Sequence, residues 1–348
     1  MAHSVQRIPD REIVIDGKPN LYFGGTAYLG LQNHTPFKEL YLNNVTKYGM
    51  HYGASRNSNI ALDIYRATER HLANWAGSES CLTMSSGYLA AQLVVHHLLE
   101  KGHPVIAAPH AHTALLINGV KTASDMDELV QFTSEEIARN QQIPVILFDT
   151  IDFSGQQFPN FEGLRQLPLN KVILVGDDSH GIGIVGDNGN GCYSMLKALQ
   201  PAKLLVCCSL GKALGIQAGA IFGDHEDIKL LESTSFYGGA SPASPAFMAT
   251  LLEAKDLFSE RLETLKNNYR LFKSQLKNPS FFDHIDGHPT FEFQNDEVAS
   301  ALNKDGFVFT NFNYPDENGP RVSRLVLSAY HKKEDIQKLV ASVNTLTD

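Results

Sequence analysis

A lysine and an aspartate each follow a short apolar run, and together they have the chemistry to hold an aldehyde-bearing cofactor. Lys212 lies in the small-residue turn 209–215, directly after the run 204–207, and Asp177 closes a segment that begins with the run 172–175. If both runs are neighbouring strands, the amine and the carboxylate meet at one edge of a sheet. Pyridoxal 5'-phosphate (PLP) requires this pair, because its aldehyde forms an imine with an amine and its ring nitrogen stays protonated beside an anion.

Each of these residues also has a simpler interpretation. Most lysines are solvated surface residues, and an aspartate after a strand is commonly a helix N-cap. Lys212, however, lies between Gly211 and Ala213 beside a predicted buried strand, where an unpaired ammonium is costly. An imine with PLP removes that cost. His180, three residues after Asp177, is either a structural histidine or a partner of the cofactor's phenolic oxygen.

A serine-glycine segment opens a predicted helix and is a candidate phosphate site. It consists of Ser85, Ser86, Gly87 and Tyr88. The N-terminus of a helix presents free N–H groups and the positive end of the helix dipole, and both favour phosphate. Plain N-capping by a serine is an equally good interpretation of the segment by itself. Ser209, in the lysine turn, is a second candidate phosphate ligand.

Two histidines follow the apolar run 105–108, at the expected ligand edge of the sheet. Either His112 or His110 could stack on a planar cofactor and move a proton. We expect no metal site, because no carboxylate or cysteine completes a ligand set around the other nearby histidines, which we interpret as structural: His96, His97 and His103.

The spacing of β-type runs predicts an α/β fold with a mostly parallel sheet. The intervals between the first four runs suit helical crossovers, and Asp149, Asp177 and the lysine turn each follow such a run. We expect an N-terminal segment (1–35), a large α/β domain (36–243) and a small C-terminal α+β domain (244–348), with an ordered loop at 236–245 and a long helix at 246–275. The runs are 105–108, 145–148, 172–175, 204–207 and 220–222.

The composition excludes several classes of function. The 348 residues carry a formal net charge of −9 without a block of lysine or arginine, which disfavours nucleic acid or an anionic membrane as a partner. No run reaches the length of a membrane span, and the N-terminus has no signal-peptide core. The four cysteines do not form a disulfide framework, which is typical of a reducing, cytosolic compartment.

Six motifs, in the same order, resemble those of the α-oxoamine synthases, a branch of the fold type I PLP-dependent enzymes. The resemblance extends from about residue 11 to the end of the chain. The motifs are YLGL at 28–31, YG and GASR within 48–56, SSGY at 85–88, DDSHG at 177–181, SLGKALG at 209–215 and RLVLSAYH at 324–331.

The resemblance implies a role for each site residue. Lys212 carries PLP and moves protons at the substrate α-carbon, Asp177 pairs with the ring nitrogen, and His112 rather than His110 is the stacking histidine. Arg324 binds the carboxylate of the amino acid, and Ser154 is nearest to the family's substrate-facing serine. The remaining cofactor-binding positions are Ser86, Gly87, Tyr88, His180 and Ser209.

The family's reaction condenses a small amino acid with an acyl-CoA, in most members with loss of CO2, and gives an amino ketone. The resemblance implies a homodimer with active sites at the subunit interface. Two alternatives remain open: another fold type I reaction, such as transamination or lyase chemistry, and a catalytically silent partner subunit. The second arises because the family's early asparagine is replaced near Thr26, and because Gly238 and Gly239 replace a Ser/Thr pair that reaches the phosphate from the partner subunit in the family. Retention of Lys212 argues against it.

Overall fold

The computed structural model describes residues 3–139, 141–153, 157–313 and 317–347. These residues form two compact units, one of residues 35–255 and one that combines residues 1–34 with 256–348. This division differs from the expected domain bounds. The N-terminal segment joins the C-terminal part of the chain, and residues 244–255 stay with the larger unit.

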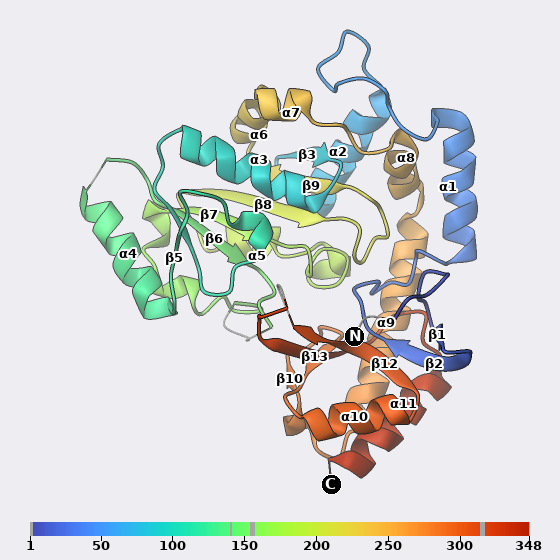
Figure 1. Ribbon diagram of the computed structural model, residues 1–348. Coiled ribbons are helices and arrows are strands. Elements are labelled where there is room, and N and C mark those ends of the chain that lie inside the picture. Colours follow the sequence, from blue (N-terminus) through green and yellow to red (C-terminus); the bar gives the residue numbers. More distant parts are fainter. Residues whose placement is uncertain (1–2, 140, 154–156, 314–316, 348) are drawn as a thin grey trace. The chain divides into compact units, whose positions relative to one another are not determined.

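The larger unit contains a seven-stranded sheet in the order β3-β9-β8-β7-β6-β4-β5 (Figure 1). The strands from β8 to β5 run parallel to one another, and β9 is antiparallel to both of its neighbours. The prediction of a mostly parallel sheet is therefore confirmed. The strands are β3 (Ser80–Met84), β4 (Val105–Ala107), β5 (Lys121–Thr122), β6 (Val145–Asp149), β7 (Ile173–Asp177), β8 (Lys203–Ser209) and β9 (Gly219–Gly223).

Helix α3 (Gly87–Glu100) lies across one face of this sheet, and its apolar side chains share a core with the strands (Figure 1). Helix α2 (Asp63–Ala76) ends at Gly77, which takes the left-handed conformation with φ 80° and donates its N–H to Ala73 O. The other helices of this unit are α1 (Thr35–Tyr48), α4 (Met126–Arg139), α5 (Tyr193–Lys197), α6 (His225–Glu232), α7 (Ser235–Gly239) and α8 (Pro245–Glu253).

Three local expectations differ from the structure. Among the described residues between β6 and β7 (150–153 and 157–172), two short 3-10 turns, η2 (Leu164–Gln166) and η3 (Leu169–Lys171), are found instead of a crossover α-helix. The expected loop at 236–245 contains α7, whose N-cap Thr234 accepts the N–H of Tyr237. The expected long helix is two helices, α8 and α9 (Lys255–Gln275), because Ala254 leaves helical geometry with φ −89° and ψ 14°.

The smaller unit contains a six-stranded sheet in the order β1-β2-β12-β13-β11-β10. Strand β2 pairs in parallel with β12, which explains why the N-terminal residues belong to this unit. Most of α9, together with α10 (Asp296–Lys304) and α11 (Lys333–Leu346), completes it. The strands are β1 (Glu12–Ile15), β2 (Lys18–Phe23), β10 (Asp283–His284), β11 (Thr290–Glu292), β12 (Phe307–Asn313) and β13 (Arg321–Val326).

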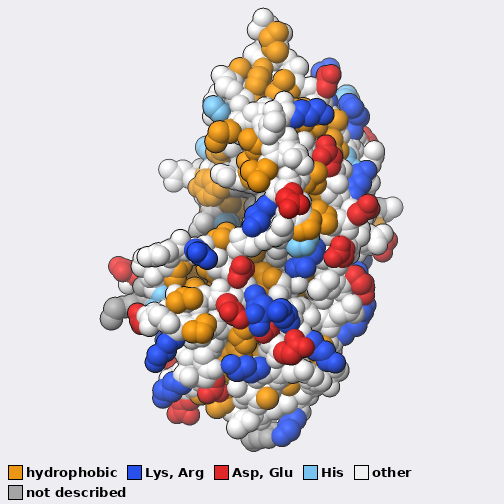
Figure 2. Space-filling view, turned by 90° about the vertical axis from the view of Figure 1, so that its right-hand side faces the viewer, with side chains coloured by type: hydrophobic (Ala, Val, Ile, Leu, Met, Phe, Trp, Pro, Cys, Tyr) orange, Lys and Arg blue, Asp and Glu red, His pale blue; other side chains and the backbone are white. Residues whose placement is uncertain are grey.

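The surface carries charges of both signs. On the face in Figure 2, basic and acidic side chains are interspersed. Within the described ranges, no helix has the length and apolar character needed to cross a membrane. All four cysteines are buried and free.

Candidate active site

The carboxyl ends of β6, β7 and β8 bring the proposed site residues to one edge of the large sheet. Asp149 closes β6 and Asp177 closes β7, and the two are paired in register. Lys212 lies in the loop between β8 and β9, and this loop is closed by the pairing of Ser209 with Gly219. The prediction that an amine and a carboxylate follow neighbouring strands is therefore correct as a statement of topology.

The amine of Lys212 contacts an imidazole. Its Nζ lies 2.8 Å from Nε2 of His180, and both side chains are partly buried. A hydrogen bond at this distance requires one of the two nitrogens to offer a lone pair. The pair is therefore not doubly charged, and it contains a nitrogen able to accept a proton.

His112 lies close to the charges of Asp177 and Lys212. Burial lowers the pKa of its imidazole, the charge of Asp177 opposes this change, and the charge of Lys212 adds to it. The ring nitrogen Nδ1 accepts the N–H of Ala114 at 3.1 Å, so His112 caps the 3-10 turn η1 (Thr113–Leu115). His110, the alternative histidine, is exposed and has a left-handed backbone with φ 60°.

Asp177 does not cap a helix. Strand β7 ends at this residue, and its Oδ1 accepts the N–H of Ser179 at 2.9 Å within a turn. The next residue, Asp178, is 1% exposed and accepts hydrogen bonds from Thr150 Oγ1 (2.6 Å) and Cys192 N (3.0 Å). Burial is the main reason why the pKa of Asp178 is raised to about 6. Asp178 therefore fixes the segment that follows Asp177.

The N-terminus of α3 lies directly against the end of β8. Ser86 is its N-cap and accepts the N–H of Leu89 at 3.1 Å, so the capping interpretation of the serine is confirmed. A Cβ on Gly87 would lie 2.6 Å from Ser209 Cα, and one on Gly219 would lie 2.2 Å from Ser86 O. Only glycine permits this approach, which sets Ser209 beside the free N–H groups of the helix.

Two further candidates at this helix end differ in exposure and in bonding. Tyr88 is 53% exposed. Ser209 is partly buried; its N–H donates to Ser179 Oγ at 2.8 Å, and its own Oγ accepts the N–H of Gly211 at 3.2 Å. The second bond orders the start of the lysine loop.

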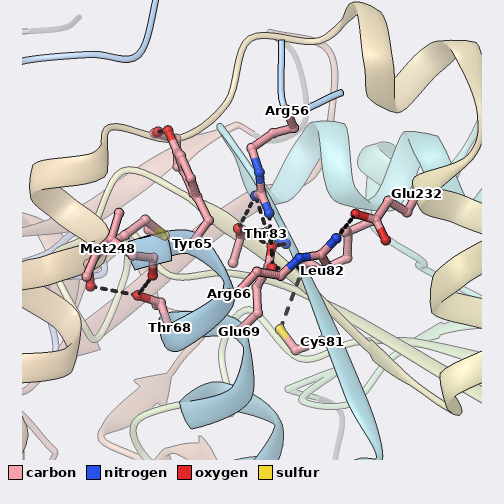
Figure 3. A network of polar contacts seen from close by, with 12 residues as sticks. Arg56, Tyr65, Arg66, Thr68, Glu69, Cys81, Leu82, Thr83, Glu232 and Met248 are labelled. Carbon is pink, nitrogen blue, oxygen red and sulfur yellow. Dashed lines mark hydrogen bonds and ion pairs between the residues drawn. The ribbon is translucent and has the colours of Figure 1, made fainter. Parts of the chain in front are cut away.

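A buried ion pair fixes the segment that contains the motif GASR (Figure 3). Both guanidinium NH groups of Arg56 bind the carboxylate of Glu69, at 2.9 and 3.1 Å, and Thr83 of β3 donates its N–H and hydroxyl to the same carboxylate. The guanidinium also lies 4.2 Å from the centre of the Tyr65 ring. Arg56 thereby ties the segment before α2 to the edge of the sheet, close to the start of α3.

The two predicted substrate-binding residues, Arg324 and Ser154, are not among the groups described above. Arg324 belongs to β13 in the smaller unit, where its Nε lies 2.8 Å from Oε2 of Glu292. Ser154 lies outside the described residues. Among the residues that the structure describes, no group of three or more His, Cys, Asp or Glu side chains is arranged to hold a metal ion.

The chemistry of these groups fits PLP. One edge of the sheet carries an amine, a carboxylate at the end of the adjacent strand and a partly buried imidazole. The helix N-terminus held against Ser209 by Gly87 offers N–H donors to a phosphate. Sequence reasoning recognised Asp149 as a residue at a strand end but gave it no role; its pairing with Asp177 was the missing information.

Known proteins resemble the chain over nearly its whole length. It is 28% identical, over 353 aligned positions, to 8-amino-7-oxononanoate synthase of Aliivibrio fischeri, covering 96% of this chain and 91% of that protein. It is 27% identical to the protein of the same name from Thermoanaerobacter pseudethanolicus, covering 93% and 86%. No family model matches the chain.

Solved structures share the fold. A serine palmitoyltransferase from S. paucimobilis with bound PLP–myriocin aldimine superimposes with a TM-score of 0.82 at 18% identity, covering 99% of this chain and 92% of that one. An 8-amino-7-oxononanoate synthase from Francisella tularensis gives a TM-score of 0.71 at 18% identity, covering 94% and 98%. The expected fold type I architecture is therefore confirmed.

Proposed function

We propose that this chain, which belongs to the α-oxoamine synthase family, is a PLP-dependent acyltransferase that condenses a small amino acid with an acyl-CoA. When bound, PLP supplies an aldehyde that forms an imine with an amine, and a ring that absorbs negative charge. One observation carries the proposal. Lys212 and Asp177 follow neighbouring parallel strands, and the charges of both act on the imidazole of His112.

Lys212 and Asp177 have distinct tasks in this proposal. The amine of Lys212 would hold the cofactor through its aldehyde, and the same amine would serve as the base that removes the α-proton of the amino acid. His180, in contact with Nζ at 2.8 Å, orients that amine and reaches the cofactor's phenolic oxygen. Asp177 keeps a positive charge on the ring nitrogen, since a nearby anion favours the protonated form.

The remaining site residues bind and orient. The N–H groups at the start of α3, between Ser86 and Tyr88, and the hydroxyl of Ser209 hold the phosphate. His112 would stack on the ring, and because its pKa is lowered it keeps a neutral imidazole near pH 7. The neutral ring can orient the acyl carbonyl by a hydrogen bond, and it can protonate that carbonyl only after it has accepted a proton. Arg324 binds the amino acid's carboxylate, a task that suits a planar two-pronged donor.

The products and the assembly follow the family's pattern in this proposal. The substrate carbon attacks the thioester, CoA leaves, and CO2 is then lost to give an amino ketone. We propose a homodimer with its active sites at the subunit interface. Apolar side chains exposed in the larger unit support a protein interface: Leu42 (61%), Met50 (74%) and Ile60 (62%). A cytosolic location stays a prediction from the cysteines.

A direct test adds PLP to the purified protein and follows its visible absorbance, then supplies an amino acid together with an acyl-CoA and measures free CoA thiol. We expect uptake of PLP and release of thiol that needs both substrates. Lys212→Ala should lower turnover roughly a thousandfold or more. Lys203→Ala, which removes an exposed lysine at the start of β8 that is paired with Asp227, is the matched control and should leave turnover unchanged.

Two other outcomes would replace the proposal. Conversion of the amino acid without release of thiol would indicate a transaminase or a lyase on the same fold. A protein that takes up no PLP would indicate a silent partner subunit. Asp177→Asn removes the charge at the ring nitrogen while keeping the shape of the side chain. It should weaken a working active site, and it should change nothing in a protein that has none.

A further inference from the structure

Asp149 ends β6 beside the proposed site, and none of the roles above uses it. It is paired in register with Asp177 on the adjacent parallel strand. Paired residues of neighbouring strands point to the same face of a sheet. The two carboxyl groups therefore share one side of the sheet edge. Two carboxylates in such a position repel each other, and one of them holds a proton well above its usual pH range.

The surroundings decide which carboxyl keeps the proton. Asp177 is the acid that we propose to face a cationic ring nitrogen. Burial and the charge of Asp177 raise the pKa of Asp149 well above its usual range, and Asp152 adds to this effect. The N–H of His112 and the charge of Lys212 oppose it but do not reverse it. Asp149 is thus the acid that keeps the proton.

Asp149 also contacts the main chain of the stacking histidine. Its Oδ1 accepts the N–H of His112 at 3.4 Å, a long but directional contact. The carboxyl further lines a pocket with polar and titratable neighbours from the segments after β4 and β6: His110, Asp152 and Gln157. The titratable groups around Asp149 therefore come from four segments: Asp177, His110 and His112, Asp152, and Lys212.

We propose that Asp149 is a positioning residue of the cofactor site, which carries a proton while Asp177 carries the charge and which anchors the main chain of His112. This inference rests on the proposed PLP-dependent function. Its consequence is chemical. A second carboxylate at this edge would hold Lys212 as an ammonium and His112 as an imidazolium, and neither could then accept a proton. The proton on Asp149 keeps both bases available.

The test compares Asp149→Asn, a neutral mimic of the protonated acid, with Asp149→Ala, which removes the acceptor for the His112 N–H. Asp152→Asn, a neighbouring acid of the same pocket, is the control. The first measurement is a titration with PLP followed by visible absorbance at neutral pH. We expect Asp149→Asn and Asp152→Asn to bind PLP within about threefold of wild type, and Asp149→Ala to bind about tenfold more weakly.

The second measurement uses protein without PLP and follows its stability from acid to alkaline pH. An acid with a raised pKa in the folded state stabilises the fold below its unfolded pKa, and this contribution is lost as the pH rises through the folded value. Wild type should therefore lose stability with rising pH relative to Asp149→Asn, which has no proton to release at this position. This measurement does not depend on activity, and it also reports whether Asp149→Ala is folded.

Two results would overturn the inference while wild type binds PLP normally. One is PLP binding by Asp149→Asn as weak as that of Asp149→Ala, because the charged carboxylate would then be required. The other is an identical pH dependence of stability in wild type and Asp149→Asn. Failure of wild type to take up PLP would instead overturn the proposed function, and with it the role of Asp149 at the cofactor.

Discussion

Arg324 and Glu292 face each other on adjacent antiparallel strands, and the Nε of the guanidinium lies 2.8 Å from a carboxylate oxygen. About a quarter of each side chain is exposed. The arginine proposed to bind the carboxylate of the amino acid is therefore paired before any substrate arrives. A substrate carboxylate must compete with Glu292 or share the guanidinium with it.

Glu292→Gln should therefore lower the KM for the amino acid. A partly exposed ion pair is worth up to about 1 kcal/mol, so the expected decrease is about fivefold, with little change in kcat. Steady-state kinetics with the amino acid varied will measure it. Glu263→Gln, which removes an exposed acid paired with Arg270 in the same unit, is the control. A KM that rises in Glu292→Gln would mean that Glu292 helps to hold the substrate.

Gly87→Ala should weaken PLP binding and destabilise the protein. The added Cβ would lie 2.6 Å from Ser209 Cα and 2.7 Å from Ser209 N, and this strand backbone leaves it no room. Overpacking of this kind costs about 1–3 kcal/mol. PLP titration and thermal unfolding will measure the two effects. In Gly53→Ala, the control, the added Cβ has no atom within 4 Å. Equal behaviour of the two variants would refute the close approach of α3 to β8.

Glu69→Gln should lower the free energy of unfolding by about 3 kcal/mol, since it leaves the buried guanidinium of Arg56 without its counter-charge. Urea unfolding will measure the loss. Glu232→Gln, the control, removes the partner of the exposed Arg66 in the same network (Figure 3) and should cost less than about 1 kcal/mol. Equal losses would show that Arg56 is not a buried charge.

His331 should make the smaller unit sensitive to acid. Burial lowers the pKa of this imidazole to about 4. The ring accepts the N–H of Ser328 at Nδ1, contacts Tyr22 O through Nε2 and stacks on Phe23, an arrangement that suits the neutral form. Because the unfolded chain binds a proton near pH 6.5 and the folded chain does not, stability is lost as the pH falls from 6.5 toward 4.

The loss from this one group is about 3 kcal/mol over that window. Chemical unfolding at a series of pH values will follow the free energy, and NMR of labelled histidine will follow the ring itself. We expect the ring signals of His331 to stay unchanged down to about pH 5. A titration of His331 at the ordinary value would contradict the prediction.

The sequence was sufficient to predict β4, β6, β7 and β8 of the parallel part of the large sheet, because each contains a short apolar run. The two-residue strand β5, which has no apolar residue, was not predicted. Strand β9 was found, but its antiparallel direction was not. Strand β3 was missed; its partner β9 is far away in the chain. The pairing of β2 with β12 joins residues even further apart in the chain, so the N-terminal segment was assigned to no sheet.

The positions of site residues at or after strand ends could be predicted from the sequence. The contacts that their side chains make could not. Lys212 and Asp177 lie where topology requires, and Gly87 opens its helix as expected. The contact of Lys212 with His180 and the register of Asp149 with Asp177 depend on loop conformation and strand pairing, which local patterns do not encode. The pairing of Arg324 with Glu292 likewise needed the alignment of β11 with β13.

The loop that carries Lys212 is tied at both ends, since Ser209 pairs with Gly219 and the N–H of Leu210 donates to Ala218 O at 2.9 Å. These two pairings fix the number of residues that the loop can contain. A residue inserted or deleted between the two ties would turn the amine away from the sheet edge or pull the strands out of alignment. Over evolutionary time this stretch can exchange its side chains, but it cannot grow or shrink without losing the amine's position.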